Sequence, residues 1–179
     1  MKSQALLERC RRLRLLLSDV DGVLTDGTVL FLPDGRELKP FHIRDGLGIV
    51  LAQRAGLRVG IVSGRSSEVV ERRAAELGMS IVLQGVRDKR AALHELLERE
   101  SLHPSQVAYI GDDLNDLALM QEVGLSAAPA DAAREVREQA FMLTEARGGQ
   151  GCLRELIEAI LRARGEWDGL VADFVGASG

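Results

Sequence analysis

The sequence predicts an α/β fold in which a Rossmann-like parallel sheet carries helices on both faces. Short apolar runs typical of strands alternate along the chain with amphipathic runs typical of helices. Each strand-like run tends to end where Gly or Asp begins. This alternation is the pattern of repeated βαβ units, which place their strands parallel in one sheet.

The strand-like runs are short and rich in branched apolar residues. We expect strands at residues 14–18, 58–63, 80–83, 107–111, 125–128 and 141–143. The intervening segments predict helices at residues 46–55, 66–77, 88–100, 114–123, 131–139 and 152–164. Ser66, Asp88 and Asp131 are placed to cap three of these helices, because their side-chain oxygens can accept hydrogen bonds from the first turn.

One segment, residues 28–41, interrupts the alternation. It consists of two extended runs joined by Pro33, Asp34 and Gly35, which favour a tight turn. We therefore expect a β-hairpin inserted after the first strand. The glycine-rich residues 165–179 predict an irregular C-terminal tail. The organisation expected is a single domain at residues 1–164, with the hairpin inserted in it, followed by the tail.

Composition excludes several kinds of partner. The net charge of −4 and the aromatic content of 3% leave no basic stripe or stacking surface for nucleic acid. The apolar run at residues 15–17 is far too short for a signal-peptide core or a membrane span. Cys10 and Cys152 show no metal-binding or redox spacing. We expect a cytoplasmic protein with reduced thiols that binds neither nucleic acid nor membrane.

A pair of carboxylates follows the first predicted strand. Asp19 and Asp21 are two residues apart, so in an extended chain both side chains point to the same side. They come at the carboxyl end of the strand, which is the edge where open α/β sheets bind ligands. Alone, the pair is equally typical of a solvated turn.

A second acidic group follows the strand at residues 107–111. Asp112, Asp113 and Asp116 stand at the start of a predicted helix, where a single Asp could serve only as a cap. Two acidic strand ends together indicate a metal site, because neighbouring carboxylates repel and Mg²⁺ is commonly held by a few carboxylates, waters and a substrate phosphate.

Two further polar residues suit a bound phosphate. Ser63 stands at a strand-to-helix turn, where a hydroxyl and backbone N–H groups can bind an anion. Lys89 begins a helix, a position where the helix dipole disfavours a cation and an anionic partner is expected. Each has an ordinary alternative, a turn residue for Ser63 and an exposed surface lysine for Lys89.

In combination these segments resemble the four motifs of the haloacid dehalogenase-like (HAD) phosphatases. The match in order and spacing runs from Leu15 to Asp116 and consists of residues 19–25, Ser63, Lys89 and residues 111–116. The resemblance implies a HAD-like fold and a phosphomonoester hydrolase that works through a covalent aspartyl-phosphate.

The resemblance also implies a role for each motif residue. Asp19 is the nucleophile, and Asp21 is the general acid and base. Ser63 and Lys89 stabilise the charge of the transferring phosphoryl group. The implied cofactor is Mg²⁺, held by the Asp19 carboxylate, the backbone carbonyl of Asp21 and Asp112. Asp113 and Asp116 are expected to orient these ligands from behind.

The intervals between motifs are too short for the large cap domain that many HAD phosphatases carry. Residues 35–49, Gln84-Gly85 and residues 148–151 resemble one capless group, the 3-deoxy-D-manno-octulosonate 8-phosphate phosphatases of lipopolysaccharide precursor biosynthesis. The likeness implies a phosphorylated sugar acid as substrate. It also implies the following substrate-binding residues: Asp21, His42, Ile43, Arg44, Asp45, Gly46, Arg65, Arg73 and Lys89. Related nonulosonate 9-phosphates stay open as the substrate, since they share the keto-acid end and the terminal phosphate.

Two other functions compete with this interpretation. A response-regulator receiver also combines an acidic pair, a phosphorylated Asp, a hydroxyl residue and a Lys on a parallel sheet. Its phospho-accepting Asp follows a later strand than the acidic pair, where this chain has Ser63. A non-catalytic regulatory HAD-like domain is the second alternative, and the presence together of Asp19, Asp21, Lys89 and Asp112 argues against it.

The hairpin and the tail predict self-association. The hairpin carries more apolar side chains than a solvent-facing hairpin should expose. The resemblance implies a homotetramer in which hairpins meet around a central axis. The tail has Trp167, Leu170, Val171 and Phe174 among glycines, which suits docking near a neighbouring subunit's site, with plain terminal disorder as the alternative.

Overall fold

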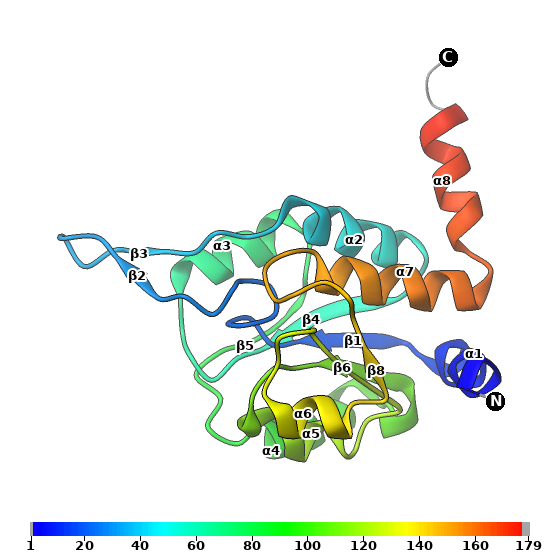
Figure 1. Cartoon of the computed structure of the whole chain (residues 1–179), viewed down its shortest axis with the longest axis horizontal. Helices are drawn as coiled ribbons and strands as arrows, with labels where there is room; N and C mark the ends of the chain where they lie inside the picture. The colour runs from blue at the N-terminus through cyan, green and yellow to red at the C-terminus, as the bar shows by residue number, and fades with distance from the viewer. Residues whose placement is uncertain (1, 177–179) are drawn as a thin grey trace.

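A sheet of six parallel strands forms the centre of the computed structural model, which describes residues 2–176 (Figure 1). The strand order is β5-β4-β1-β6-β7-β8. The strands are β1 (Leu15–Ser18), β4 (Arg58–Val62), β5 (Ile81–Leu83), β6 (Val107–Ile110), β7 (Leu125–Ala128) and β8 (Met142–Leu143). Every pair in the sheet is parallel, which confirms the predicted fold class.

Strand β1 is buried on both faces, as a central parallel strand must be. Leu16 belongs to the apolar core on one face, and Leu15 and Leu17 belong to the core on the other. Leu15 lies opposite both Arg58 of β4 and Val107 of β6, so the three strands start level and end level. Strands β4 and β5 are added on one side of β1, and β6, β7 and β8 are added on the other side. The boundary between β1 and β6 is therefore a topological switch point, which is where ligands bind in open α/β sheets.

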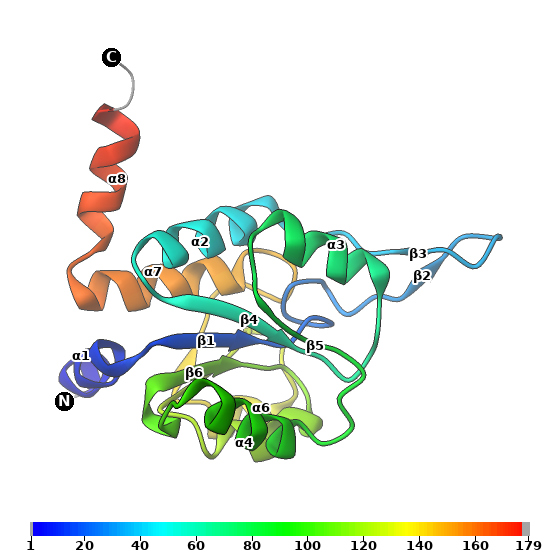
Figure 2. The same cartoon turned by 180° about the vertical axis from the view of Figure 1, so that it is seen from behind.

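Helices cover the two faces as separate layers (Figures 1 and 2). One layer contains α1 (Lys2–Arg12), α2 (Ile43–Arg54), α3 (Glu68–Glu76) and α7 (Cys152–Arg164). The other contains α4 (Lys89–Glu100), α5 (Leu117–Met120) and α6 (Arg134–Gln139). Short 3₁₀ helices at Pro104–Gln106 and Leu114–Asp116 precede β6 and α5.

The inserted hairpin is present where the sequence predicts it. Strands β2 (Leu30–Phe31) and β3 (Glu37–Leu38) pair antiparallel and project from the body of the molecule (Figure 1). The turn between them uses a positive φ of 84° at Gly35, a conformation that costs glycine little. Val29, Leu30, Phe31 and Leu38 are all exposed, Phe31 to 64%.

Several local expectations are wrong. Asp88 caps α4 by accepting from the N–H groups of Arg90 and Ala91. However, α3 begins after Ser67 rather than Ser66, and α6 begins only at Arg134. Asp131 instead accepts the N–H of Gly148 and so holds a different loop.

The two chain ends differ most from the prediction. Helix α1 was not expected; it contacts α7, and its buried Cys10 belongs to the same apolar core as the inner face of α7. The tail is not irregular, because α8 (Trp167–Gly176) follows α7 and is anchored by the buried Trp167. The last residues of the predicted tail, 177–179, lie outside the described part. Among residues 2–176, no helix has the length and apolarity needed to cross a membrane.

Candidate active site

A pocket of about 310 Å³ opens at the carboxyl ends of β1, β4 and β6. Because the three strands end level, the residues that follow them converge on this edge. Its lining contains six residues singled out from the sequence: Asp19, Asp21, Ser63, Arg65, Asp112 and Asp113. Gly27, Val29, Gly64 and Asn115 complete it.

Lys89 joins two carboxylates beneath the pocket. Its Nζ lies 2.9 Å from Asp19 Oδ1 and 2.6 Å from Asp116 Oδ1, and the side chain is almost completely buried. The hydroxyl of Tyr109, on β6, donates to the same Asp116 oxygen at 2.5 Å. The ammonium group at the start of α4 therefore has the anionic partners that its position requires.

Asp116 uses both carboxylate oxygens within the protein. Oδ1 accepts from Lys89 and Tyr109, and Oδ2 accepts from the backbone N–H groups of Asp112 and Asp113 at 2.9 and 3.1 Å. A carboxylate saturated in this way positions its neighbours rather than binding a ligand. Asp116 thus fixes both Lys89 and the loop that carries Asp112.

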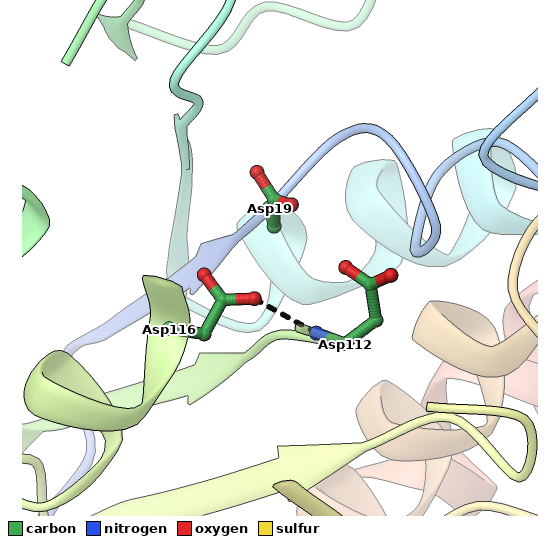
Figure 3. A group of neighbouring side chains, drawn as sticks. All are labelled: Asp19, Asp112 and Asp116. Carbon is green, nitrogen blue, oxygen red and sulfur yellow. Dashed lines mark hydrogen bonds between the residues drawn. The ribbon is translucent and has the colours of Figure 1, made fainter. Parts of the chain in front are cut away.

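Asp112 faces Asp19 across the pocket (Figure 3). Carboxylate oxygens of Asp19, Asp112 and Asp116 lie within 4.8 Å of one another. Burial, together with the charges of Asp19 and Asp116, raises the pKa of Asp112 to about 8. Burial likewise raises the pKa of Asp19 to about 6, although Lys89 opposes the rise.

The carboxylates of Asp19 and Asp112 fit a divalent cation. Among the described residues, no group donates a hydrogen bond to the buried Asp112 Oδ1, so that oxygen is available as a ligand. The donors are hard oxygens, which Mg²⁺ prefers, and a bound cation would offset both the burial of these charges and their mutual repulsion, which raise the two pKa values. A Cβ on Gly22 would lie 1.9 Å from Asp112 Oδ2, so only glycine lets the two loops approach this closely.

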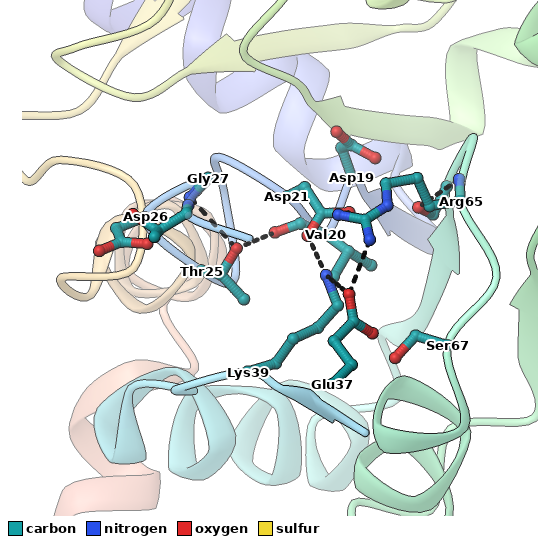
Figure 4. A network of polar contacts seen from close by, with 12 residues as sticks. Asp19, Val20, Asp21, Thr25, Asp26, Gly27, Glu37, Lys39, Arg65 and Ser67 are labelled. Carbon is teal, nitrogen blue, oxygen red and sulfur yellow. Dashed lines mark hydrogen bonds and ion pairs between the residues drawn. The ribbon is translucent and has the colours of Figure 1, made fainter. Parts of the chain in front are cut away.

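Asp21 belongs to a separate network of charges (Figure 4). Its Oδ1 forms an ion pair with Lys39, and its Oδ2 lies 3.9 Å from Arg65 Nη1. Glu37, on β3, bridges the two cations, with Oε1 at 3.4 Å from Lys39 Nζ and 2.8 Å from Arg65 Nη2. The hairpin therefore contributes charged groups to the site.

Ser63 and Arg65 line the pocket just after β4. Ser63 is buried, and its Oγ accepts the backbone N–H of Arg65 at 3.3 Å. Among the described residues, Arg65 Nη1 has no hydrogen-bond partner. A hydroxyl and a guanidinium at one strand end can together bind an anion.

The segment at the start of α2 lies elsewhere in a single copy of the chain. His42, Asp45, Gly46 and Arg73 line a small apolar cavity of about 10 Å³ between α2 and α3, and no described residue of this set lines the pocket around Asp19. Asp45 is buried, and its Oδ1 accepts the N–H of Arg154 at 2.7 Å, at the start of α7. Ile43 and Arg44 are exposed.

Comparison with known proteins places this site in a family. A model of the haloacid dehalogenase-like hydrolases matches residues 79–156. The 3-deoxy-D-manno-octulosonate 8-phosphate phosphatase KdsC of Yersinia pestis is 43% identical over 163 residues, which cover 91% of this chain and 87% of that protein. The chain belongs to this phosphatase family of HAD-like hydrolases.

Solved structures of 3-deoxy-D-manno-octulosonate 8-phosphate phosphatases have the same fold. The crystal structure from Yersinia pestis matches with a TM-score of 0.90 and 42% identity, over 92% of this chain and 89% of that chain. The structure from Moraxella catarrhalis, in complex with a magnesium ion, a phosphate ion and a KDO molecule, matches with a TM-score of 0.92 and 37% identity, over 94% of this chain and 97% of that chain.

Sequence reasoning missed several residues of this HAD phosphatase site. Asn115 and Val29 line the pocket, and Tyr109 and Lys39 hold carboxylates of the site. Tyr109 occupies the strand just before the acidic loop, so a polar group in an apolar strand was the available signal. Lys39 gave no local signal, because its partner Asp21 is separated from it by the whole hairpin.

Proposed function

We propose that the chain is a magnesium-dependent phosphomonoester hydrolase that converts 3-deoxy-D-manno-octulosonate 8-phosphate to 3-deoxy-D-manno-octulosonate and phosphate, a step of lipopolysaccharide precursor biosynthesis. The observation that carries the proposal is the pairing of Asp19 with buried Lys89 beside Asp112, in a pocket at the switch point of the sheet. The identity of 43% with a phosphatase of this substrate supports the choice of substrate.

The first half of the reaction forms a covalent intermediate. An oxygen of Asp19 attacks phosphorus, and the bond from phosphorus to the sugar oxygen breaks with its electron pair left on that oxygen. Asp21 gives its proton to the leaving oxygen. Lys89 holds Asp19 Oδ1, and with Ser63 it balances the charge on the phosphoryl group.

The second half returns the enzyme to its starting state. Water attacks phosphorus and gives a proton to Asp21, and the bond between phosphorus and Asp19 breaks to release phosphate. Bound Mg²⁺, held by the Asp19 carboxylate, the Asp21 carbonyl and Asp112, supplies the positive charge that screens the carboxylates from the phosphate. Asp113 and Asp116 keep the Asp112 loop in place.

Arg65 is the residue best placed to bind the sugar acid beyond the phosphate, because it lines the pocket and its Nη1 has no hydrogen-bond partner among the described residues. We also propose that the segment of residues 42–46 and Arg73 complete the binding site. Exposed Arg44 offers a guanidinium suited to a carboxylate. Asp45 supports this segment from within, through its bond to α7.

A panel of phosphorylated sugar acids tests the substrate. We expect phosphate release with magnesium and none with chelator, and the highest kcat/KM for 3-deoxy-D-manno-octulosonate 8-phosphate. The measurement is phosphate released per time across eight-carbon and nine-carbon acids. A higher kcat/KM for a nonulosonate 9-phosphate would mean that the substrate is a nine-carbon acid phosphate. If no monoester released phosphate, the chain would instead be a non-catalytic HAD-like domain.

The assembly that we propose is a homotetramer in the cytoplasm. The exposed apolar residues of the hairpin support burial against another subunit, and closed symmetry is the usual form of such assemblies. The cysteines Cys10 and Cys152 are buried thiols, which suits a reducing compartment. Nucleic acid and membrane are not proposed as partners, on the charge and composition of the chain.

We propose that residues 165–179, beyond the domain of residues 1–164, close a neighbouring subunit's site. Helix α8 projects from the body, as both views show (Figures 1 and 2). Trp167 packs between the guanidinium groups of Arg154 and Arg162, with each 5.1 Å from the ring centroid. Val171, Phe174 and Val175 stay exposed and give α8 an apolar surface for a partner.

Truncation at Leu170 tests this role. The shortened chain keeps the Trp167 anchor and loses the exposed apolar residues, so we expect the mass of the oligomer to hold and KM for the sugar acid phosphate to rise. Light scattering gives the mass, and steady-state kinetics give KM. A monomeric full-length protein would refute the shared site, and unchanged kinetics would leave α8 without a role in closure.

A further inference from the structure

We propose that Lys39 is a positioning residue for Asp21, which it reaches from the base of the hairpin and holds in place for proton transfer to the leaving oxygen. The inference rests on the proposed function, because it assigns the proton transfer to Asp21. It gives a charged residue of the hairpin a role in a site whose catalytic carboxylates follow strands of the central sheet.

Lys39 is buried in a way that surface lysines are not. Its side chain is only 1% exposed, although the neighbouring Leu38 is 47% exposed. Successive side chains of an extended chain point to opposite sides. Because Leu38 points to solvent, the next side chain, Lys39, points toward the body of the molecule. A desolvated ammonium group needs paired charge, and Lys39 finds it in Asp21 Oδ1 and in Glu37 Oε1.

Two cations contact the Asp21 carboxylate, one at each of its oxygens. Lys39 faces Oδ1 and Arg65 faces Oδ2, while Glu37 binds both cations and keeps them together (Figure 4). A carboxylate with a cation on each oxygen has little freedom to rotate. The orientation of Asp21 is thus set by side chains of the hairpin and of the loop after β4.

Of the two cations, Lys39 is the one that fixes Asp21. Arg65 Nη1 lies 3.9 Å from Asp21 Oδ2, beyond hydrogen-bond distance, and its side chain is 39% exposed, so this contact constrains Asp21 less and leaves the guanidinium able to meet substrate. Lys39 is buried in direct contact, and it is not among the described residues that line the pocket. It therefore acts through Asp21 and does not touch the reacting atoms.

Misplacing a general acid has a specific kinetic signature. A basic leaving group needs the proton in the transition state, whereas a weakly basic one departs without it. Loss of Lys39 should therefore slow esters with basic leaving groups more than activated esters. A residue with a merely structural role would slow both to the same extent.

The test compares 4-methylphenyl phosphate with 4-nitrophenyl phosphate, which are close in shape and differ in the basicity of the leaving group. The readout is kcat/KM for 4-methylphenyl phosphate divided by kcat/KM for 4-nitrophenyl phosphate. Each kcat/KM value reports phosphoryl transfer to Asp19. We expect Lys39→Met to lower this ratio on the order of tenfold or more, part of the 10²–10⁴-fold typical of general acid catalysis. Lys39→Arg keeps the charge and should recover most of the ratio.

Arg36→Met is the matched control, because it removes a positive charge from the same hairpin at an exposed site paired only with Asp34 among the described residues. It should leave the ratio unchanged. Lys39→Gln is read by the same ratio if Lys39→Met does not fold, as circular dichroism will show. If active Lys39 variants keep the wild-type ratio, Lys39 does not position Asp21, and the proposed function still stands. If the wild-type protein is inactive on every ester, the proposed function is wrong, and the role of Lys39 is wrong with it.

Discussion

Asp19→Asn is expected to abolish phosphate release while the protein stays folded. The substitution removes the nucleophilic oxygen and keeps the size of the side chain. Loss of an essential catalytic group commonly lowers kcat by several orders of magnitude. Lys89 keeps its second carboxylate, Asp116, at 2.6 Å, so the buried ammonium group is not left without an anionic partner.

The covalent step can be measured separately from turnover. Acid quenching of the wild-type enzyme during turnover, followed by borohydride reduction, should convert the aspartyl-phosphate of Asp19 to homoserine, detectable by mass. Asp26→Asn is the matched control, since Asp26 lies in the same loop, is exposed, and its Oδ1 accepts the Thr28 N–H, a bond that Asn can also accept. Turnover at the wild-type rate by Asp19→Asn would rule out the covalent mechanism.

The core of the fold was predictable because each central strand is apolar on both faces and is followed within two residues by Gly or Asp. Leu15, Leu17 and Ile110 are buried for this reason, and the motif residues that follow them were placed on the correct edge of the sheet. Helix α8 was not predictable from local sequence, because Gly169 and Gly176 disfavour helix. The packing of Trp167 against α7 is a tertiary contact that helps to hold it.

The candidate site was predictable to the extent that strand ends carry it. Asp19, Ser63 and Asp112 follow three adjacent strands, so topology alone brings them together. The pairing of Lys39 with Asp21 depends on how the hairpin folds back toward β1. The pattern of apolar and polar residues does not predict that geometry. For Asp45, the resemblance implied a substrate-binding residue. In the structure its Oδ1 instead accepts the N–H of Arg154 at the start of α7.

Asp112→Asn is expected to lower activity strongly and to shift the response to magnesium to much higher concentrations. Asn is nearly the same shape, so it fits against Gly22, where a Cβ would lie 1.9 Å from Asp112 Oδ2. No described group hydrogen-bonds Asp112 Oδ1, so the change breaks no bond at that atom. It removes one negative charge from a group of three and weakens a hard ligand, and high magnesium should restore part of the activity.

Thermal unfolding gives a readout of the same change that needs no substrate. In chelator above about pH 8, where Asp112 is ionised, the variant should melt at a higher temperature than wild type, because the cost of burying that charge and its repulsion by Asp19 and Asp116 are gone. A gain of about 1 kcal/mol corresponds to a shift of roughly 2–4 °C for a protein of this size. Magnesium should stabilise wild type by binding the folded state and should stabilise the variant much less.

Asp113→Asn is the matched control, because it removes a neighbouring negative charge without removing the proposed magnesium ligand. Asp113 is the next residue along the chain, and its Oδ1 caps a short helix by accepting the Leu114 N–H, a bond that Asn can also accept. We expect its magnesium dependence and its melting temperature to stay close to those of wild type. If Asp112→Asn kept a wild-type dependence on magnesium in both kinetics and melting, Asp112 would not be a ligand, and the cation would have to be held by Asp19 with other oxygens of the pocket.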